Sequence, residues 1–362
     1  MSLLFTPVTI RGIEFRNRLW VSPMGMFNAP EGVPAAWHRT HLAQFAAGGA
    51  GLVMAEATAV SHEGRYSPVD TGIWNDEQRD AWAPIVADIH QRGAKAGIQI
   101  AHAGRKAPHW WPASGREGAI APEDGGWTPV APTAIAYPGL PEPTALDEAG
   151  IRKVVDDHVS AARRAVEAGF DVIEIHAAHG YLLHQFLSPL TNHRDDAWGG
   201  SLEHRERLVV DVVRAVRAEI GDETAVFVRF SGTDAAPGGL TPEVVGRVAR
   251  HALDAGADLN DVSSAGLVAE QHIDVFPGYQ VPLAAEVRLV SGGLTGAVGL
   301  ISTPQQAEDI LRAGDADVVF AGRAWLKNPH FGLHAADELL GTHGHWPIQY
   351  VRASRARMEH AS

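Results

Sequence analysis

The sequence predicts one enlarged (β/α)8 TIM barrel, because short apolar runs typical of buried strands alternate with amphipathic helical segments along all 362 residues. No linker-like segment interrupts this alternation. Barrels of this kind form one domain of about 250 residues and tolerate insertions that take them past 400. We therefore expect residues 1–362 to form a single domain. The eight candidate strands cover residues 18–21, 51–55, 97–101, 171–175, 225–229, 258–262, 288–291 and 317–321.

Ordinary start and stop signals flank the helical segments between these strands. Polar residues and proline precede the helical pattern at Thr241-Pro242 and Ser302-Thr-Pro304. Three helices are expected to end at glycine, which adopts the left-handed C-cap conformation without strain. These glycines are Gly169, Gly256 and Gly314.

One connection is much longer than a barrel loop needs to be. Residues 103–145 follow the third predicted strand and contain eight prolines, six glycines and three tryptophans. Long structured loops usually have a function. We interpret this insertion as a lid over a binding site; the alternative is a surface excursion whose tryptophans pack against the side of the barrel.

Composition excludes several classes of protein. The absence of cysteine rules out disulfides, thiolate metal sites and a cysteine nucleophile. The formal net charge of −13 argues against nucleic acid as a partner. No run of about 18 apolar residues predicts a membrane span, and no basic and apolar leader is visible at the N-terminus, so we expect a cytoplasmic protein. None of the four lysines ends a predicted strand, which disfavours Schiff-base and pyridoxal enzymes.

The fourth predicted strand leads directly into His176, His179 and Tyr181. Side chains at the C-terminal ends of barrel strands converge on one open face, so these three groups can reach one ligand. Two neutral imidazoles can hydrogen-bond one oxygen, and a tyrosine hydroxyl can deliver a proton. Either histidine alone would be interpreted as an interior residue, but together with the tyrosine they predict a reaction site.

Several short motifs occur in a specific order between residues 4 and 352. They are Ser22-Pro-Met24, Glu56-Ala57, the run from Gln99 to Lys106, His176-Ala-Ala-His179-Gly-Tyr181, Thr295-Gly-Ala-Val-Gly299 and Gly322-Arg323. In this order the chain resembles the FMN-dependent old yellow enzymes, and within them the bacterial thermophilic-like ene-reductases.

The resemblance implies an NAD(P)H oxidoreductase with tightly bound FMN that reduces the C=C bond of α,β-unsaturated carbonyl or nitro compounds. NADPH or NADH would leave a hydride on flavin N5 and depart before the activated alkene binds, which is a ping-pong cycle. No glycine-rich dinucleotide motif follows a strand, so a separate nucleotide domain is not expected.

The resemblance also assigns residues to the cofactor. Arg229 would stabilise the negative charge of reduced FMN near N1 and O2; its simpler interpretation is a salt bridge to Glu174 or Glu56. Gln99 would bond the pyrimidine side of the flavin ring. The flavin cradle would comprise Ser22, Pro23, Met24, Gly25 and Ala57, and the phosphate site Gly296, Gly322 and Arg323, with Lys106 as a further charge.

For the substrate, the resemblance implies that His176 and His179 hold the carbonyl or nitro oxygen while Tyr181 protonates the α-carbon. Arg352 resembles an arginine that enters the active site of a neighbouring subunit, so segment 340–362 would reach that subunit in a homodimer or homotetramer. An exposed terminal arginine is the alternative.

Two positions depart from the family pattern. The thermophilic-like class usually has cysteine and tyrosine where this chain has Gly25 and Phe27. Loss of the thiol predicts a different flavin potential and a roomier pocket, with altered substrate orientation. Phe27 keeps an aromatic wall for the substrate but lacks the hydroxyl.

Two other functions remain open at this stage. A zinc-dependent TIM-barrel hydrolase could use His176 and His179 with His184 or His102. A non-catalytic flavin-binding protein would keep the cofactor residues without needing the histidines and Tyr181. A 2-hydroxyacid oxidase shares the barrel but not this histidine and tyrosine pattern.

Overall fold

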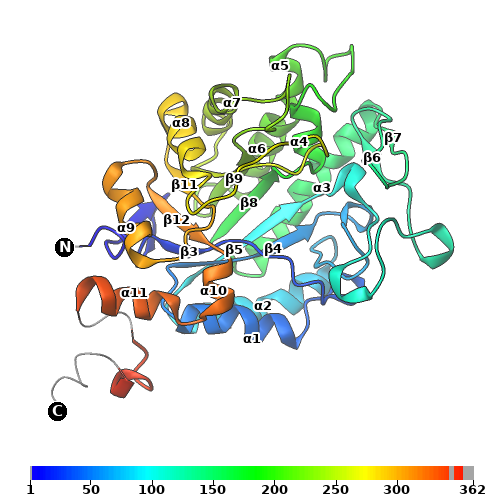
Figure 1. Ribbon diagram of the computed structural model, residues 1–362. Helices are drawn as coiled ribbons and strands as arrows, with labels where there is room; N and C mark the ends of the chain where they lie inside the picture. The colour runs from blue at the N-terminus through cyan, green and yellow to red at the C-terminus, as the bar shows by residue number, and fades with distance from the viewer. Residues whose placement is uncertain (1, 342–345, 354–362) are drawn as a thin grey trace.

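The computed structural model describes residues 2–341 and 346–353 and confirms the predicted barrel (Figure 1). Eight parallel strands close in the order β10-β11-β12-β3-β4-β5-β8-β9. In chain order they are β3 (Leu19–Val21), β4 (Leu52–Ala59), β5 (Lys95–Ala101), β8 (Val172–Ala177), β9 (Ala225–Ser231), β10 (Leu259–Ser263), β11 (Thr295–Ala297) and β12 (Val318–Ala321).

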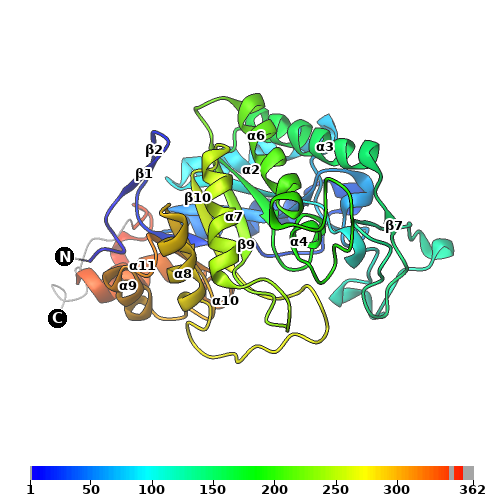
Figure 2. The same ribbon diagram turned by 90° about the horizontal axis from the view of Figure 1, so that it is seen from above.

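Helices surround the barrel and connect its strands (Figures 1 and 2). They are α1 (Ala36–Ala47), α2 (Asp76–Gln91), α3 (Glu148–Glu167), α4 (Leu182–Leu187), α5 (Leu202–Arg205), α6 (Arg207–Ile220), α7 (Pro242–Asp254), α8 (Val281–Ser291), α9 (Pro304–Ala313), α10 (Arg323–Lys327) and α11 (Phe331–Leu340). In the described part of the chain, no helix combines the length and the apolar character that crossing a bilayer requires. Glycines 169, 256 and 314 have φ of +97°, +118° and +76°, as expected for C-caps.

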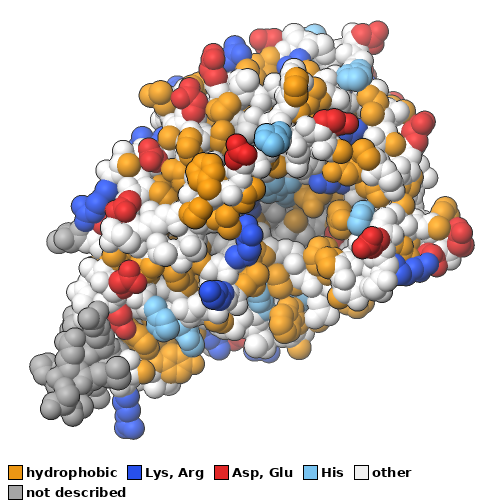
Figure 3. All heavy atoms as spheres, in the orientation of Figure 1, with side chains coloured by type: hydrophobic (Ala, Val, Ile, Leu, Met, Phe, Trp, Pro, Cys, Tyr) orange, Lys and Arg blue, Asp and Glu red, His pale blue; other side chains and the backbone are white. Residues whose placement is uncertain are grey.

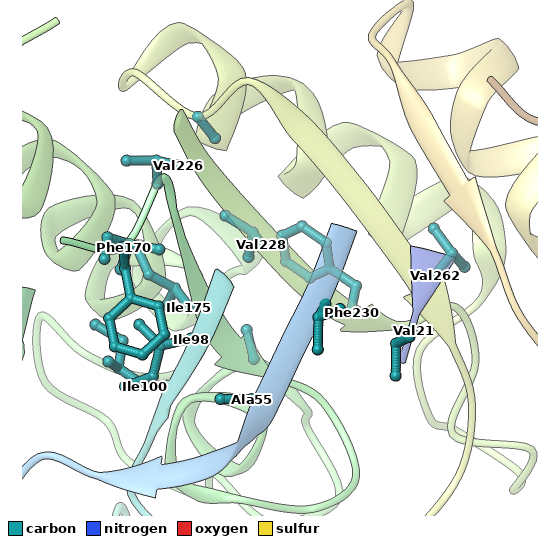
Figure 4. Close-up of a cluster of buried hydrophobic side chains, with 14 of the residues drawn as sticks. Val21, Ala55, Ile98, Ile100, Phe170, Ile175, Val226, Val228, Phe230 and Val262 are labelled. Carbon is teal, nitrogen blue, oxygen red and sulfur yellow. The ribbon is translucent and has the colours of Figure 1, made fainter. Parts of the chain in front are cut away.

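Alternation along the strands divides the core in two. Side chains such as Ile98, Ile175 and Val228 point outward and pack beneath the helices (Figure 4). The inward side chains form a second cluster around Trp20, which stacks on Phe227 with ring centroids 5.9 Å apart. This second cluster includes residues of an N-terminal hairpin, β1 (Val8–Ile10) and β2 (Ile13–Phe15), that the sequence interpretation did not anticipate.

The predicted seventh strand at residues 288–291 is wrong. These residues form the last turn of α8, and the strand is β11, four residues further on. The apolar pair Leu289-Val290 imitated a short strand, but Arg288 pairs with Asp317 and Gly292 ends the helix at φ +69°. An apolar pair within a four-residue segment does not distinguish a helix end from a buried strand.

The insertion at 103–145 is packed against the barrel. It contains three short 3-10 helices and the small two-stranded sheet of β6 (Val130–Ala131) and β7 (Thr144–Ala145). Trp127 donates its Nε1–H to the Glu63 carbonyl at 3.0 Å, and the Arg65 guanidinium lies 5.2 Å from the Trp127 ring centroid. These contacts fix the insertion beside the barrel mouth.

Candidate active site

A polar layer lies above the apolar interior of the barrel. Because alternate residues of a strand point inward, Arg229 follows Phe227 into the barrel, and Gln99, Glu174 and His176 occupy equivalent inward positions. A cavity of about 530 Å³ opens above this layer. Histidine and basic side chains gather along the hollow at this end of the barrel (Figure 3).

His176 and His179 lie together, and their hydrogen bonds define one set of tautomers. The Ala178 N–H donates to His176 Nδ1 at 3.2 Å, so the His176 proton is on Nε2, which lies 3.3 Å from His179 Nδ1. His179 Nε2 then donates to Ser263 Oγ at 2.8 Å. Burial, reinforced by the charge of Arg229, lowers the pKa of both histidines well below the usual value. Both rings are therefore neutral donors at pH 7.

Tyr181 completes the cluster. Its ring lies 4.8 Å from the His176 ring, centroid to centroid, and burial raises the pKa of Tyr181 well above the usual value, so the phenol keeps its proton. The Lys106 ammonium lies 5.5 Å from the Tyr181 centroid and donates to the carbonyls of His179 and Gly266. Burial lowers the pKa of Lys106 to about 8. Lys106 thus belongs to this cavity and not to the expected phosphate site.

Arg229 has a partner that the sequence interpretation did not name. Its Nε lies 3.1 Å from Asp261 Oδ2, on the neighbouring strand, and its Nη2 donates to Ser22 Oγ at 3.1 Å. Gln99 donates to Glu174 Oε2 at 2.6 Å. Burial, and then the nearby Asp261 carboxylate, raise the pKa of Glu174 well above the usual range. Glu174 is therefore protonated, and Asp261 carries the charge that pairs with Arg229.

A second cavity, of about 370 Å³, adjoins the first along His179, which lines both. Its lining includes Ser22, Met24, Gly299, Gly322 and Arg323. Gly296 lines neither cavity. A Cβ at that position in β11 would lie 2.6 Å from the Phe320 ring, so this glycine makes room for the apolar interior.

The first cavity is lined by four further residues that the sequence analysis assigned to the flavin or the substrate. Pro23, Gly25, Phe27 and Ala57 line it. A Cβ added to Gly25 would lie 3.4 Å from Phe27 Cζ, and the backbone of Gly25 does not have a positive φ. Glycine is therefore not required there by conformation, and its effect is to leave space beside the Phe27 ring.

Sequence reasoning missed several lining residues, among them Tyr66, Asp70, His109 and Tyr137. Tyr66 and Asp70 lie in the loop after the second barrel strand, a position that could have identified them. Burial raises the pKa of Asp70 to about 6 and that of Tyr66 to about 12. Tyr137 belongs to the insertion, where its sequence context gave no signal.

Arg352 does not line either cavity of its own chain. It is exposed within a single 3-10 turn, Val351–Ala353. Residues 342–345 and 354–362 of the expected subunit-bridging segment lie outside the described residues.

The histidines do not form a metal site in the part of the chain that the structure describes, where no group of three or more His, Cys, Asp or Glu side chains could hold an ion. Both nitrogens of His184 are engaged by other groups. His102 Nδ1 accepts from the Gly104 N–H. The donor set of the zinc hydrolase alternative therefore does not assemble.

The family follows from comparison with known proteins. The model of the NADH:flavin oxidoreductase / NADH oxidase family matches residues 3–340. The chain belongs to this family. An NADPH dehydrogenase of Listeria monocytogenes serovar 1/2a is 46% identical over 356 residues, which cover 98% of this chain and 99% of the relative. An NADPH dehydrogenase of Geobacillus sp. (strain WCH70) is 44% identical over 357 residues, with the same coverage.

Solved structures place this flavin oxidoreductase among the old yellow enzymes. The old yellow enzyme homologue of Zymomonas mobilis is 31% identical, with a TM-score of 0.75 over 90% of each chain. Morphinone reductase in complex with tetrahydroNAD is 28% identical, with a TM-score of 0.76 over 93% of this chain and 90% of that one. These comparisons confirm the expected family and enzyme class, and together with the closed barrel they confirm the expected fold.

The turn that presents His179 and Tyr181 generates a prediction. Gly180 has φ +74°, and a Cβ there would lie 2.1 Å from the Gly266 carbonyl oxygen. We expect Gly180→Ala to lower the free energy of unfolding by about 3 kcal/mol or more, from the left-handed backbone and the clash together. Gly200 has φ +76° with open space around it. The matched variant Gly200→Ala should cost only about 1–2 kcal/mol; equal losses for the two variants in urea unfolding would contradict the clash.

Proposed function

We propose that this chain is an FMN-dependent NAD(P)H ene-reductase that reduces the C=C bond of α,β-unsaturated carbonyl or nitro compounds. The observation that carries the proposal is the convergence of Arg229, the two neutral histidines and the protonated Tyr181 on one cavity. A site that combines a fixed cation, paired neutral donors and a phenol suits a reaction in which an oxygen gains charge and a carbon gains a proton.

The two adjoining cavities fit FMN. The Arg229 guanidinium and the Gln99 amide are buried polar groups that line the larger cavity, which is the kind of lining that a polar ligand requires. Gln99, Arg229 and the loop after β3 would hold the flavin ring, and Arg323 in the adjoining cavity would pair with the phosphate. Gly299 and Gly322 line that second cavity, and we favour Gly299 over Gly296 for phosphate binding.

When bound, FMN would supply the hydride chemistry that links oxidation of NADPH or NADH to reduction of the alkene, and the two substrates would use the cavity in turn. In this proposal His176 Nε2 and His179 Nε2 donate to the substrate oxygen, and the His176–His179 and His179–Ser263 hydrogen bonds break when substrate binds. Hydrogen bonds that strengthen as this oxygen becomes negative lower the barrier selectively. Tyr181 delivers the proton to the α-carbon.

The relatives support a nicotinamide donor. The curated bacterial relatives are NADPH dehydrogenases, and a structural neighbour was solved with tetrahydroNAD. The insertion contributes Lys106, His109, Tyr137 and Leu140 to the cavity lining. We therefore propose that the insertion acts as a lid by forming one wall of the cavity at its entrance.

We also retain the proposal that Arg352 enters the active site of a neighbouring copy in a homodimer or homotetramer. Its support is local: Ile348 and Tyr350 beside it are 77% and 44% exposed. These two side chains line the same surface hollow, and a contiguous exposed apolar patch is typical of a surface that another chain covers.

The proposal is tested by the visible spectrum of the purified protein before and after anaerobic NADPH, followed by cyclohexenone. Flavin bands that bleach with NADPH and return with cyclohexenone are the expected result. A colourless protein would contradict FMN binding, and a bound flavin that never bleaches would contradict the proposed reaction.

Replacing the proposed proton donor separates the two half-reactions. We expect Tyr181→Phe to slow alkene reduction by about 10²- to 10⁴-fold, because the general acid is removed, while flavin reduction by NADPH changes little. Tyr66→Phe is the matched control, since Tyr66 lines the same cavity. The rate of each half-reaction is measured by stopped flow. A similar loss of alkene-reduction rate in both variants would refute the assignment of Tyr181.

Filling the space at Gly25 tests the departure from the family pattern. Gly25→Cys should shift the flavin midpoint potential and the enantiomer ratio of the product, and should raise KM for alkenes with a bulky substituent by about 10-fold. Gly25→Ala adds the Cβ without the sulfur and should reproduce only the steric effect. Unchanged potential and product configuration in Gly25→Cys would contradict the prediction.

A further inference from the structure

A buried network lies behind the turn that carries His179 and Tyr181, outside the cavity lining. Gly180, between these two residues, has both backbone groups held by helix α4. Its N–H donates to His184 Nδ1 at 3.0 Å, and its carbonyl accepts from Gln185 Nε2 at 2.7 Å. Both side chains are fully buried. The helix one turn further along the chain therefore holds the turn in place.

The hydrogen bond from Gly180 determines the tautomer of His184. Because Nδ1 accepts, the proton lies on Nε2, which donates to Asp234 Oδ1 at 2.7 Å. Asp234 Oδ2 accepts from Ser188 Oγ at 2.6 Å and from the Leu240 N–H at 2.8 Å. Burial alone would raise the pKa of Asp234, but the hydrogen bonds from His184 and Ser188 outweigh it and lower that pKa. The network is thus a carboxylate, an imidazole and a backbone amide in series.

We propose that His184 and Asp234 are positioning residues for the reaction, which rests on the function proposed above. The turn is locally costly, since His179 has φ +58° as a non-glycine residue. Without an acceptor at His184, the buried Gly180 N–H would lose its partner, which costs about 1–3 kcal/mol and favours relaxation of the turn. Relaxation would move the His179 ring and the Tyr181 hydroxyl together, and displacement by about 1 Å can cost 10²-fold in rate.

The same residues are not a hydrolytic triad. Ser188 donates to Asp234 and not to His184, so the imidazole is not placed to accept the serine proton. All three side chains are fully buried, which excludes a substrate. The role that fits a buried His184 behind Gly180 is to hold the turn that carries His179 and Tyr181.

Three variants test the tautomer as well as the contact. His184→Ala removes the acceptor, and we expect kcat for cyclohexenone reduction to fall about 10- to 100-fold with KM changed less than about threefold. His184→Asn places Oδ1 near the position of Nδ1 and should restore most of the rate. Asp234→Asn should behave like His184→Ala, because neither orientation of the new amide suits the network. If its Nδ2 faces the Leu240 N–H, two donors meet there. If its Nδ2 donates to His184 Nε2, the imidazole proton is forced onto Nδ1, against the Gly180 N–H.

Amide hydrogen exchange of the peptide that contains Gly180, on the FMN-loaded enzyme, gives a readout that does not depend on turnover. Exchange should be faster by about 10-fold or more in His184→Ala and Asp234→Asn and close to wild type in His184→Asn. His158→Ala is the matched control, because His158 is equally buried on α3 and, among the residues that the structure describes, hydrogen-bonds only the Val154 carbonyl. It should lower stability without changing kcat or exchange at Gly180.

The outcomes separate the two proposals. A wild-type enzyme that does not reduce cyclohexenone contradicts the proposed function, and the exchange data still decide whether His184 holds Gly180. Wild-type kcat and exchange in Asp234→Asn would overturn the positioning role. So would a His184→Asn variant as impaired as His184→Ala, because the acceptor would then not be what the turn requires.

Discussion

The active site depends on how a buried cation is accommodated at the top of a closed barrel. Arg229 points inward because its strand alternates, and the layer beneath it is entirely apolar. Asp261 on the neighbouring strand supplies the compensating charge, and a protonated Glu174 limits the local negative charge to one. The barrel floor is therefore close to neutral, while Arg229 can still interact with an anionic ligand above it.

The proposed catalytic residues His179 and Tyr181 lie on a single turn that is held from several sides. Helix α4 holds Gly180 from behind, Lys106 of the insertion donates to the His179 carbonyl, and Ser231 accepts from the His179 N–H at 3.0 Å. The insertion thus does more than cover the entrance. It contributes a cation to the same turn that presents the two proposed hydrogen-bonding and proton-donating groups.

The two adjoining cavities would hold the two ends of the proposed FMN, with the ring in the larger cavity, which the substrate would share, and the phosphate in the smaller one. Residues of the loop after β3 alternate between them, since Ser22 and Met24 line one cavity and Pro23 and Gly25 the other. Phe27, at φ +53°, closes the same side of the larger cavity beside the space that Gly25 leaves. Substrate selection is therefore expected to be sensitive to this short loop.

The sequence by itself determined the barrel, seven of its eight strands, and the cluster of His176, His179 and Tyr181, because strand alternation and strand-end position are local properties of the chain. It could not locate β11, since a short apolar run also fits a helix end. Only the tertiary structure decided that Asp261 pairs with Arg229, that Gly296 faces the apolar interior, and that Asp234 accepts from His184. Each of these depends on contacts between segments whose distance and direction are fixed only when the barrel closes.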